Sequence, residues 1–411
     1  MRPINATDLA PLLRKITEGL AGEMGRPAQT APDWSPFEWI VARAVSSLHG
    51  VSPLLSRTVH WQGSPEWAAF LQEQRAHTAA RHVRIVELLQ RLDEKARAAG
   101  LAAVALKGAA LHALGIYQPG DRPMADIDLL VRPADAARTA ALLQSLGFLE
   151  TSRSWKERAF TPMEGQEACD WGEHANNKIK IELHESIGER LPWQITDVTA
   201  SIFPAQPHPG LNAYSSISSL MTHVLLHAAG TMPMRALRLL HLHDLAQLSA
   251  RMSATDWEEV LAHCSPRRLW WGYPPLELVA RYFPGAIPPT VLASFRNQCP
   301  RLLARVSRRR SLYDVSFSYL WIDAFPGIEW SQSAAELLHY AASRVKPGGE
   351  HVRLRRHAAK SESWFADSEW HGLSQSRRVL RWVTSRPHRP LTMHAVRAAM
   401  ARTQRPDAAT L

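Results

Sequence analysis

Cysteine is scarce in this chain of 411 residues, and its few cysteines stand far apart. There are three, Cys169, Cys264 and Cys299, and no two of them form a C-x-x-C pair. An odd number of widely spaced cysteines indicates neither a disulfide framework nor a cysteine-ligated zinc site. We therefore expect the cysteines to be small residues of the core.

Long apolar runs are missing as well. Histidine, arginine or proline interrupts each apolar stretch well before the ~20 residues that a membrane-spanning helix needs. No charged start followed by an apolar run marks a secretion signal. An apolar content of 45% with 21% charged residues is typical of a folded chain of two or three domains. The sequence predicts a soluble, cytoplasmic protein without a transmembrane segment.

The positive charge is distributed unevenly along the chain. The formal net charge is +10, and residues 344–405 carry fourteen lysines and arginines against four acidic residues, a surplus that equals the whole excess. Clustered cations bind acidic partners such as nucleic acid, an anionic lipid surface or an acidic peptide. Because no binding motif accompanies them, we favour a solvated arm and keep an acidic partner as the alternative.

Helical periodicity dominates the first hundred residues. A helix and a linker rich in glycine and proline are expected before Phe37, where the ordered part of the chain is predicted to begin. Residues 37–56 and 66–99 have apolar positions at helical spacing. The buried side of the second segment is expected to contain Val83, Val86, Leu89 and Leu92.

The pattern changes to short strands after Gly100. Residues 101–106 form an apolar run that is typical of a buried strand, and residues 126–131 form a second one. Residues 178–185 alternate between apolar and polar side chains, so that Lys180, Glu182 and His184 share one face of a third strand. Helices are expected between the strands at residues 109–117 and 133–146.

Strands are expected to end at about residue 205. Helical segments are predicted at residues 217–229, 236–252, 256–263 and 276–282. The expected fold class is α+β: a small mixed sheet between N-terminal helices and a C-terminal helical domain. The corresponding domains are a helical lead-in at 1–99, a sheet-containing core at 100–204, a helical domain at 205–343 and a basic extension at 344–411.

Asp126 and Asp128 are the sharpest chemical feature of the sequence. Two carboxylates at positions i and i+2 of a strand project from the same face, so they can share a pair of hard cations such as Mg²⁺. An Asp pair at the start of a strongly apolar strand costs several kcal/mol to desolvate unless a cation faces it. This placement predicts a metal site that serves phosphoryl or nucleotidyl transfer.

Glu182 is expected to complete this acidic site from the polar face of the third strand. A third carboxylate near the aspartate pair would bind a metal ion or accept a proton from an attacking hydroxyl. His184 lies two residues further on the same face. His184 could orient Glu182 or assist proton transfer; the alternative is a structural histidine held by hydrogen bonds.

Lys107 and Gly108 mark the turn from the first strand into a helix. A glycine at this position allows a triphosphate to approach the backbone amides of a helix N-terminus. Lys107 offers a point charge, and Arg122 offers a planar fork for a phosphate. The alternative for both basic residues is simple exposure at the surface.

These residues resemble a family, the uncharacterised bacterial nucleotidyltransferases of the DNA polymerase beta superfamily. The similarity extends over about residues 37–250. It rests on the following positions: His49 to Val51, Leu106 to Gly108, Tyr117, Arg122 to Met124, Asp126 to Val131, Glu182 to His184, His227, Arg238 and Asp244. The resemblance implies a polymerase beta-like core, with Asp126, Asp128 and Glu182 as metal and catalytic residues and Gly108 at the triphosphate. It also implies two Mg²⁺ ions, or Mn²⁺ in their place, and a nucleoside triphosphate, ATP by preference, as donor.

Two departures from the family pattern concern the phosphate turn. Ala109 follows Gly108 where the superfamily has a second glycine or a serine, and sixteen residues separate Ala109 from Asp126, more than is usual. The leading hypothesis is nucleotidyl transfer to a hydroxyl of a small molecule, peptide or protein. The alternatives are a kinase acting on a small molecule or biosynthetic peptide, and a catalytically silent module that binds nucleic acid or protein.

The helical region contains a set of histidines that resembles a zinc site. His223, His227, His241 and His243 precede Asp244 at spacings that a zinc ion accepts. Apolar leucines surround them, and we expect His227, Arg238 and Asp244 to form a hydrogen-bonded network instead. The fifteen tryptophans, among them Trp270, Trp271, Trp321 and Trp330, are expected to anchor the core.

Overall fold

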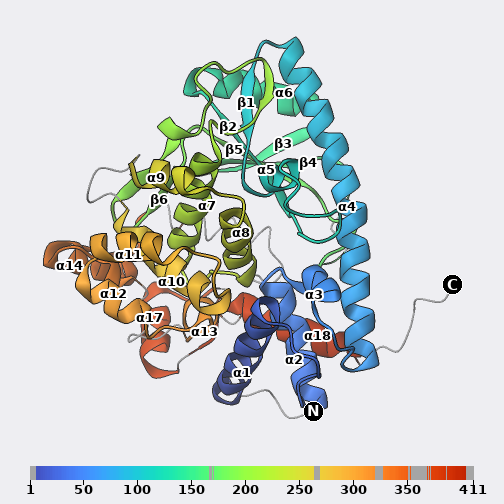
Figure 1. The fold of residues 1–411 in the computed structure, drawn as a ribbon, viewed down its shortest axis with the longest axis vertical. Helices are drawn as coiled ribbons and strands as arrows, with labels where there is room; N and C mark the ends of the chain where they lie inside the picture. Colours follow the sequence, from blue (N-terminus) through green and yellow to red (C-terminus); the bar gives the residue numbers. More distant parts are fainter. Residues whose placement is uncertain are drawn as a thin grey trace.

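The computed structural model describes an α+β protein in which helical regions flank a six-stranded mixed sheet (Figure 1). It describes residues 6–165, 169, 171–262, 269–319, 327–349, 352, 368, 370, 372–385 and 387–403. This architecture confirms the fold class predicted from the sequence. The four proposed domains and their boundaries stay predictions.

The helices and strands have the following bounds. The N-terminal region contains α1 (Ala6–Gly25), α2 (Pro36–Leu48), α3 (Ser52–Thr58) and α4 (Pro65–Ala98). The sheet region contains β1 (Ala102–Ala105), α5 (Lys107–Ala113), β2 (Asp126–Val131), α6 (Ala136–Ser145), β3 (Phe148–Arg153), β4 (Arg158–Pro162), β5 (Lys180–His184), β6 (Gly188–Arg190), β7 (Ile195–Asp197) and β8 (Gly210–Asn212). The helices that follow are α7 (Ile217–Thr231), α8 (Leu239–Ser249), α9 (Ala254–Ala262), α10 (Tyr273–Tyr282), α11 (Pro289–Gln298), α12 (Arg301–Ser307), α13 (Leu312–Ser316), α14 (Ala334–Val345), α17 (Gln375–Thr384) and α18 (Pro390–Thr403).

The main sheet has the strand order β3-β4-β5-β2-β1-β8. β2 pairs in parallel with β5 and antiparallel with β1, and β8 pairs in parallel with β1. β2 has the predicted bounds, and β1 and β5 lie inside the segments predicted for them. The two strands that carry the acidic residues are therefore neighbours at the centre of the sheet.

Alternation along β2 and β5 separates an apolar face from a polar one. Ile127, Leu129 and Val131 of β2 pack with Ile181 and Leu183 of β5. The same cluster contains Ile85, Leu88 and Leu92 of α4 and Ala140 and Leu143 of α6, so these two helices cover that face. Because neighbouring residues in a strand point to opposite faces, the acidic side chains emerge on the other side of the sheet.

Several strands differ from the sequence-based prediction. The expectation that strands end near residue 205 is wrong, because β8 continues the sheet at its β1 edge. The antiparallel pairs β3–β4 and β6–β7 were not predicted either. These strands are three to six residues long, and their pairing partners rather than their own periodicity define them. The helix expected at residues 109–117 is α5, which begins at Lys107 and ends at Ala113.

The N-terminal helices also correct two expectations. Order begins well before Phe37, because α1 buries Leu9, Leu13, Ile16 and Leu20 completely against the helical core. On α4 the buried stripe contains Ile85, Leu88 and Leu92, whereas Val83 and Val86 are 54% and 38% exposed. Helical spacing therefore predicted the correct element and placed Leu89 and Leu92 correctly, but it was wrong for Val83 and Val86.

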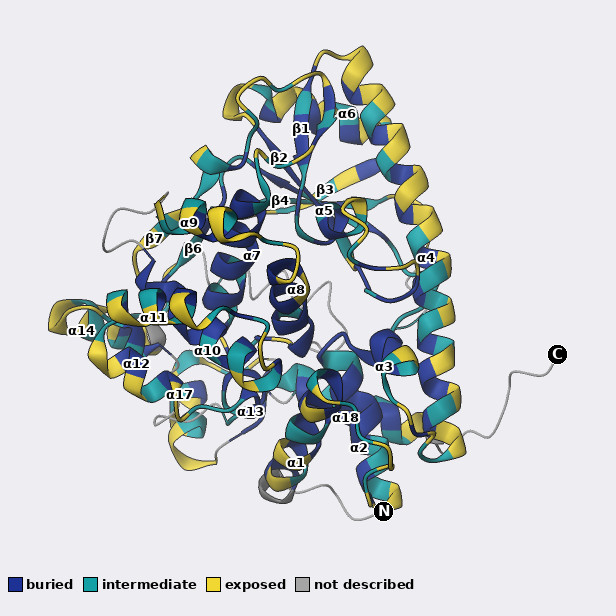
Figure 2. Cartoon of the chain, in the orientation of Figure 1, coloured by how far each residue is buried: buried dark blue, intermediate teal, exposed yellow. Residues whose placement is uncertain are grey.

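The remaining helices form a second core. α7 and α8 are buried along most of their length (Figure 2). Trp270, Trp271 and Trp330 are buried as predicted, and Trp321 lies outside the described residues. Among the cysteines, Cys299 is buried, Cys169 is only partly buried, and Cys264 lies outside the described residues. In the described part of the chain, no helix combines the length and the apolar character needed to cross a membrane.

Part of the basic C-terminal region belongs to the fold. α18 packs against α2, with Ala395, Val396 and Ala399 fully or almost fully buried in the helical core (Figure 1). Arg402 of this helix pairs with Glu73 of α4. The expectation of a solvated arm is therefore wrong for α18, while 353–367 and 404–411 lie outside the described residues. Binding of an acidic partner to the C-terminal region stays a prediction.

Candidate functional site

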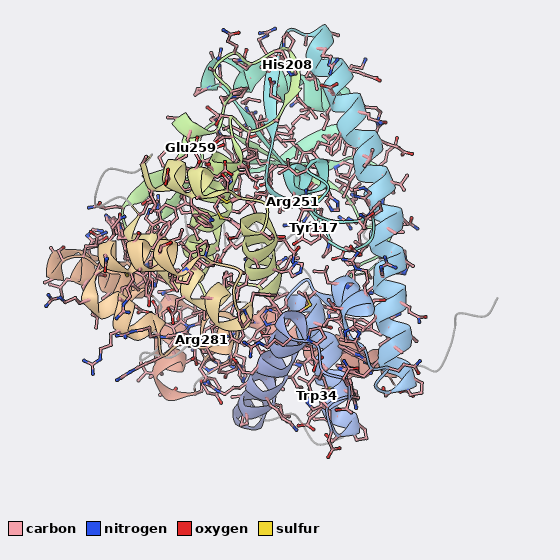
Figure 3. All side chains as sticks on the ribbon, viewed as in Figure 1. Trp34, Tyr117, His208, Arg251, Glu259 and Arg281 are labelled. Carbon is pink, nitrogen blue, oxygen red and sulfur yellow. The ribbon has the colours of Figure 1, made fainter. Side chains whose placement is uncertain are left out.

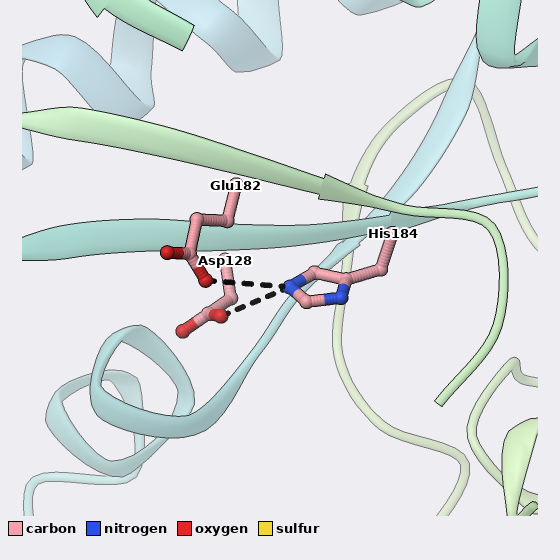
Figure 4. Close-up of side chains that lie close together, drawn as sticks. All are labelled: Asp128, Glu182 and His184. Carbon is pink, nitrogen blue, oxygen red and sulfur yellow. Dashed lines mark hydrogen bonds and ion pairs between the residues drawn. The ribbon is translucent and has the colours of Figure 1, made fainter. Parts of the chain in front are cut away.

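The register of β2 and β5 brings two of the predicted acidic residues together. Asp128 lies directly opposite Glu182 in the parallel pair, and Asp126 lies opposite Lys180 on the same face. Side-chain oxygens of Asp128 and Glu182 and a ring nitrogen of His184 lie within 4.8 Å of one another (Figure 4). In the described part of the chain this is the one group of three such side chains close enough to share a metal ion.

His184 contacts both carboxylates through the same ring nitrogen. Its Nε2 lies 3.0 Å from Asp128 Oδ1 and 3.9 Å from Glu182 Oε2. Its Nδ1 lies 3.2 Å from the carbonyl oxygen of Lys156, which can only accept, so Nδ1 carries a proton. In the neutral ring Nε2 then presents a lone pair to a carboxylate oxygen. Such a contact requires a cation between the two atoms, either a proton or a metal ion, and this donor set fits a divalent metal.

Lys107 is the fourth member of the cluster. Its Nζ donates to Asp128 Oδ1 at 2.7 Å, and its side chain is 17% exposed. Burial alone would lower the pKa of this ammonium group, but Asp128, Glu182 and Asp126 together raise it above its ordinary value. Exposure at the surface, the alternative considered for Lys107, is therefore wrong, and the lysine contributes a fixed positive charge to the acidic site.

The three carboxylates have very different proton affinities. Burial would raise the pKa of Asp128, but Lys107 and His184 hold it well below its usual range. Burial and the charge of Asp128 raise the pKa of Asp126. Burial, with Asp126 and Asp128 nearby, raises the pKa of Glu182 to about 9. Without a further cation the site therefore holds Asp128 ionised and retains a proton at Glu182 at neutral pH.

Gly108 is closely packed at the start of α5. A Cβ atom at this position would collide with Arg122 Nη1 and would lie 2.7 Å from Met124 Sδ. Any larger residue would push these side chains away from the turn. Arg122 thus lies against the backbone where the triphosphate was predicted, while contact of Gly108 with a phosphate stays a prediction.

Arg122 is bound by a residue from the helical region. Its Nε and Nη2 donate to the two carboxylate oxygens of Asp244 on α8 at 2.9 and 2.8 Å. Tyr117 donates a further hydrogen bond to Asp244 at 2.7 Å. Arg251, labelled with Tyr117 in Figure 3, donates to the carbonyl oxygens of Leu114 and Gly115. These contacts join the segment after α5 to α8 and to the turn that follows α8.

The predicted network of His227, Arg238 and Asp244 is therefore wrong in its membership. Asp244 binds Arg122 and Tyr117, as described above. His227 Nδ1 lies 3.5 Å from Glu189 Oε1 of β6, and its ring packs edge-on against His241. Surface exposure, the alternative considered for Arg122, is also excluded because its side chain is only 10% exposed.

Tyr214 is a residue of the site that the sequence did not reveal. Its hydroxyl accepts from the backbone N–H of Lys107 at 3.2 Å and lies 2.7 Å from Nδ1 of His223 on α7. Burial holds the pKa of His223 well below its usual range, so this is a hydrogen bond between a neutral ring and the tyrosine hydroxyl. This bond gives His223 a structural role, and in the described part of the chain the histidines of α7 and α8 form no metal-binding group.

Comparison with known families decides the relationship. A family model described as "Uncharacterised nucleotidyltransferase" matches residues 35–271, more than half of the chain. The chain belongs to this family. The match includes the residues described above, from Lys107 on the turn to Asp244 on α8. No curated protein and no solved structure matches the chain.

Proposed function

We propose that this chain transfers a nucleoside monophosphate from a nucleoside triphosphate to an acceptor hydroxyl. The observation that carries the proposal is the convergence of Asp128 and Glu182 from adjacent parallel strands, with His184 between them, in a member of a nucleotidyltransferase family. Membership of the family supports the reaction class, and the donor set supports a metal site.

Asp126, Asp128 and Glu182 would hold divalent metal, with His184 as a further ligand. The sequence predicted two Mg²⁺ ions with Mn²⁺ as the alternative; the ring nitrogen of His184 favours Mn²⁺ more than an all-oxygen site would. The metal, when bound, supplies positive charge that activates the attacking hydroxyl and neutralises the pyrophosphate. The remaining chemistry belongs to the side chains of the chain itself.

Glu182 is the proposed proton acceptor and Arg122 the proposed phosphate contact. The acceptor oxygen forms a bond to the α-phosphorus while the bond from that phosphorus to the bridging oxygen breaks and pyrophosphate leaves. The hydroxyl proton passes to Glu182 once this carboxylate is ionised. Asp244 holds Nε and Nη2 of Arg122. The remaining nitrogen, Nη1, lies beside Gly108, where it can meet a phosphate oxygen.

Binding of metal should release a proton from Glu182. Because the pKa of this carboxyl is raised to about 9 in the metal-free fold, the group is protonated between its ordinary pKa and about pH 9. A bound cation requires the ionised form, so affinity should increase roughly tenfold per pH unit across this interval and level off above it. Calorimetric titration with Mn²⁺ at pH 7, in buffers of different protonation enthalpy, should show release of about one proton per ion.

The same titration at pH 10 is the control, because Glu182 is then already ionised and proton release should disappear. Equal proton release at both pH values would contradict the assignment of the proton to this carboxyl.

Product analysis tests the proposed reaction. The purified protein is incubated with each of the four nucleoside triphosphates, Mg²⁺ or Mn²⁺ and a cell extract that supplies acceptors. Pyrophosphate release and an acceptor whose mass increases by one nucleoside monophosphate are expected. Release of nucleoside diphosphate with a gain of one phosphate would show a kinase instead, and absence of any metal-dependent turnover with all four donors would contradict both enzymatic readings.

A further inference from the structure

One oxygen of Asp128 is already bound by two groups of the chain. Oδ1 accepts from Lys107 Nζ at 2.7 Å and lies 3.0 Å from His184 Nε2. An aspartate that shares two metal ions needs both of its oxygens, or repeated use of one of them, for those ions. At Asp128 the Lys107 ammonium occupies a position at Oδ1 that a metal ion would otherwise take.

The backbone at Lys107 holds the ammonium in place. Lys107 has a φ of 45°, in the left-handed region that glycine adopts far more readily. A glycine would adopt this conformation with less strain, but the residue here is a lysine and the glycine is the next residue, Gly108. Lys107 is the first residue of α5, so its N–H has no acceptor within that helix. This N–H donates to the hydroxyl of Tyr214 instead. The turn thus fixes the lysine over Asp128.

The charges of the cluster are consistent with one metal ion. Asp126, Asp128 and Glu182 carry three negative charges when all are ionised. One ammonium and one divalent ion neutralise them completely, whereas two divalent ions beside a lysine would leave the protein site positive before any phosphate arrives.

We propose that the Lys107 ammonium takes the place of a second metal ion, so that this site binds one divalent ion and not two. The inference rests on the nucleotidyltransferase function proposed above and replaces its prediction of two ions. Lys107 supplies the second positive charge as a fixed point charge, which can neutralise Asp128 and a neighbouring phosphate but cannot coordinate an attacking oxygen.

The number of bound Mn²⁺ ions tests this inference without any measurement of activity. The full chain is titrated with Mn²⁺ alone, and free Mn²⁺ is followed by its electron paramagnetic resonance signal. The unaltered protein should bind one ion. Lys107→Met, which keeps the length of the side chain and removes its charge, should bind two, and the first should bind about tenfold more tightly or better because a neighbouring positive charge is gone.

Two further variants serve as controls. Lys107→Arg retains the charge and should still bind one ion. Lys95→Met makes the same chemical change at an exposed position of α4 and should behave like the unaltered protein. Thermal unfolding of each variant shows whether it is folded, and if Lys107→Met is not, Lys107→Gln replaces it.

The outcomes separate this inference from the proposed function. Two ions on the unaltered protein, or one ion on both the unaltered protein and Lys107→Met, would overturn the inference and leave a metal-dependent enzyme. An ion bound only by Lys107→Met would overturn it as well, because the ammonium would then replace the whole metal site. Absence of binding in every variant would instead contradict the proposed function.

Discussion

Asp126→Asn should lower nucleotide turnover by about a thousandfold or more without weakening the fold. The amide keeps the shape of the side chain but removes a negative charge from the proposed metal site, and a factor of this size corresponds to roughly 4 kcal/mol of transition-state stabilisation. Burial and Asp128 raise the pKa of Asp126, so its ionised form opposes folding as pH rises. The neutral amide removes this cost, and the melting temperature at pH 8 should stay equal or increase.

The corresponding change at Asp128 should lower both turnover and stability. The pKa of Asp128 is held well below its usual range, so its ionised form stabilises the fold above the ordinary pKa and loses that contribution only as pH falls through the lowered value. Asp128→Asn would leave the buried Lys107 ammonium without the carboxylate that it contacts directly. Two identical substitutions, two residues apart on one strand, should therefore move the melting temperature differently.

Turnover is measured as pyrophosphate release, and stability by thermal unfolding at pH 8. Asp33→Asn, at an exposed position between α1 and α2, is the matched control and should change neither. Turnover of Asp126→Asn within tenfold of the unaltered protein would contradict a catalytic role for Asp126. A melting temperature lowered equally by both substitutions would contradict the assigned charge states.

Local periodicity was sufficient to predict the strands that carry the acidic residues. Strand β2 was predicted at residues 126–131 and was found there, because an apolar run with Asp at two alternate positions is visible within six residues. The alternation at 178–185 likewise predicted which side of β5 is polar, and the structure confirms that Ile181 and Leu183 are buried in the apolar cluster. Both signals arise within a single strand.

Contacts between distant segments could not be predicted in this way. β8 has three residues; it pairs with β1, and the backbone N–H of Leu211 donates to Asp93 of α4. Tyr214 reaches Lys107 across 107 positions of the chain, and Arg122 reaches Asp244 across 122. No spacing in the sequence indicates such pairs, because they form only when the helical region packs against the sheet. The contact of Lys107 with Asp128 was not predicted either, because a phosphate and the solvent were the only partners considered for the lysine.

The Arg122–Asp244 pair should be among the costliest polar contacts to break. Asp244→Ala should lower the free energy of unfolding by roughly 3–5 kcal/mol, because it leaves a buried guanidinium group without its two acceptors. Arg122 and Asp244 are 10% and 5% exposed, and both oxygens of the carboxylate are used. Tyr117 would lose its acceptor as well. Denaturant-induced unfolding at pH 7 measures the loss.

An exposed ion pair provides the comparison. Arg138 is 58% exposed, and its Nη1 lies 3.1 Å from Asp135 Oδ1. Asp135→Ala removes this partner and should lower the free energy of unfolding by less than about 1 kcal/mol. A similar loss for both alanine variants would show that the buried pair contributes no more than a surface pair.

A double substitution separates the structural role of the buried pair from its chemical role. Replacing both partners by apolar residues of similar size, Arg122→Met with Asp244→Leu, removes the unpaired charge and should recover most of the stability lost in Asp244→Ala. Turnover should not recover, because the proposed phosphate contact is still missing. If the double variant regained both stability and turnover, the pair would only join the sheet region to α8. Recovery of stability alone would place Arg122 in the chemistry and leave Asp244 as the residue that positions it.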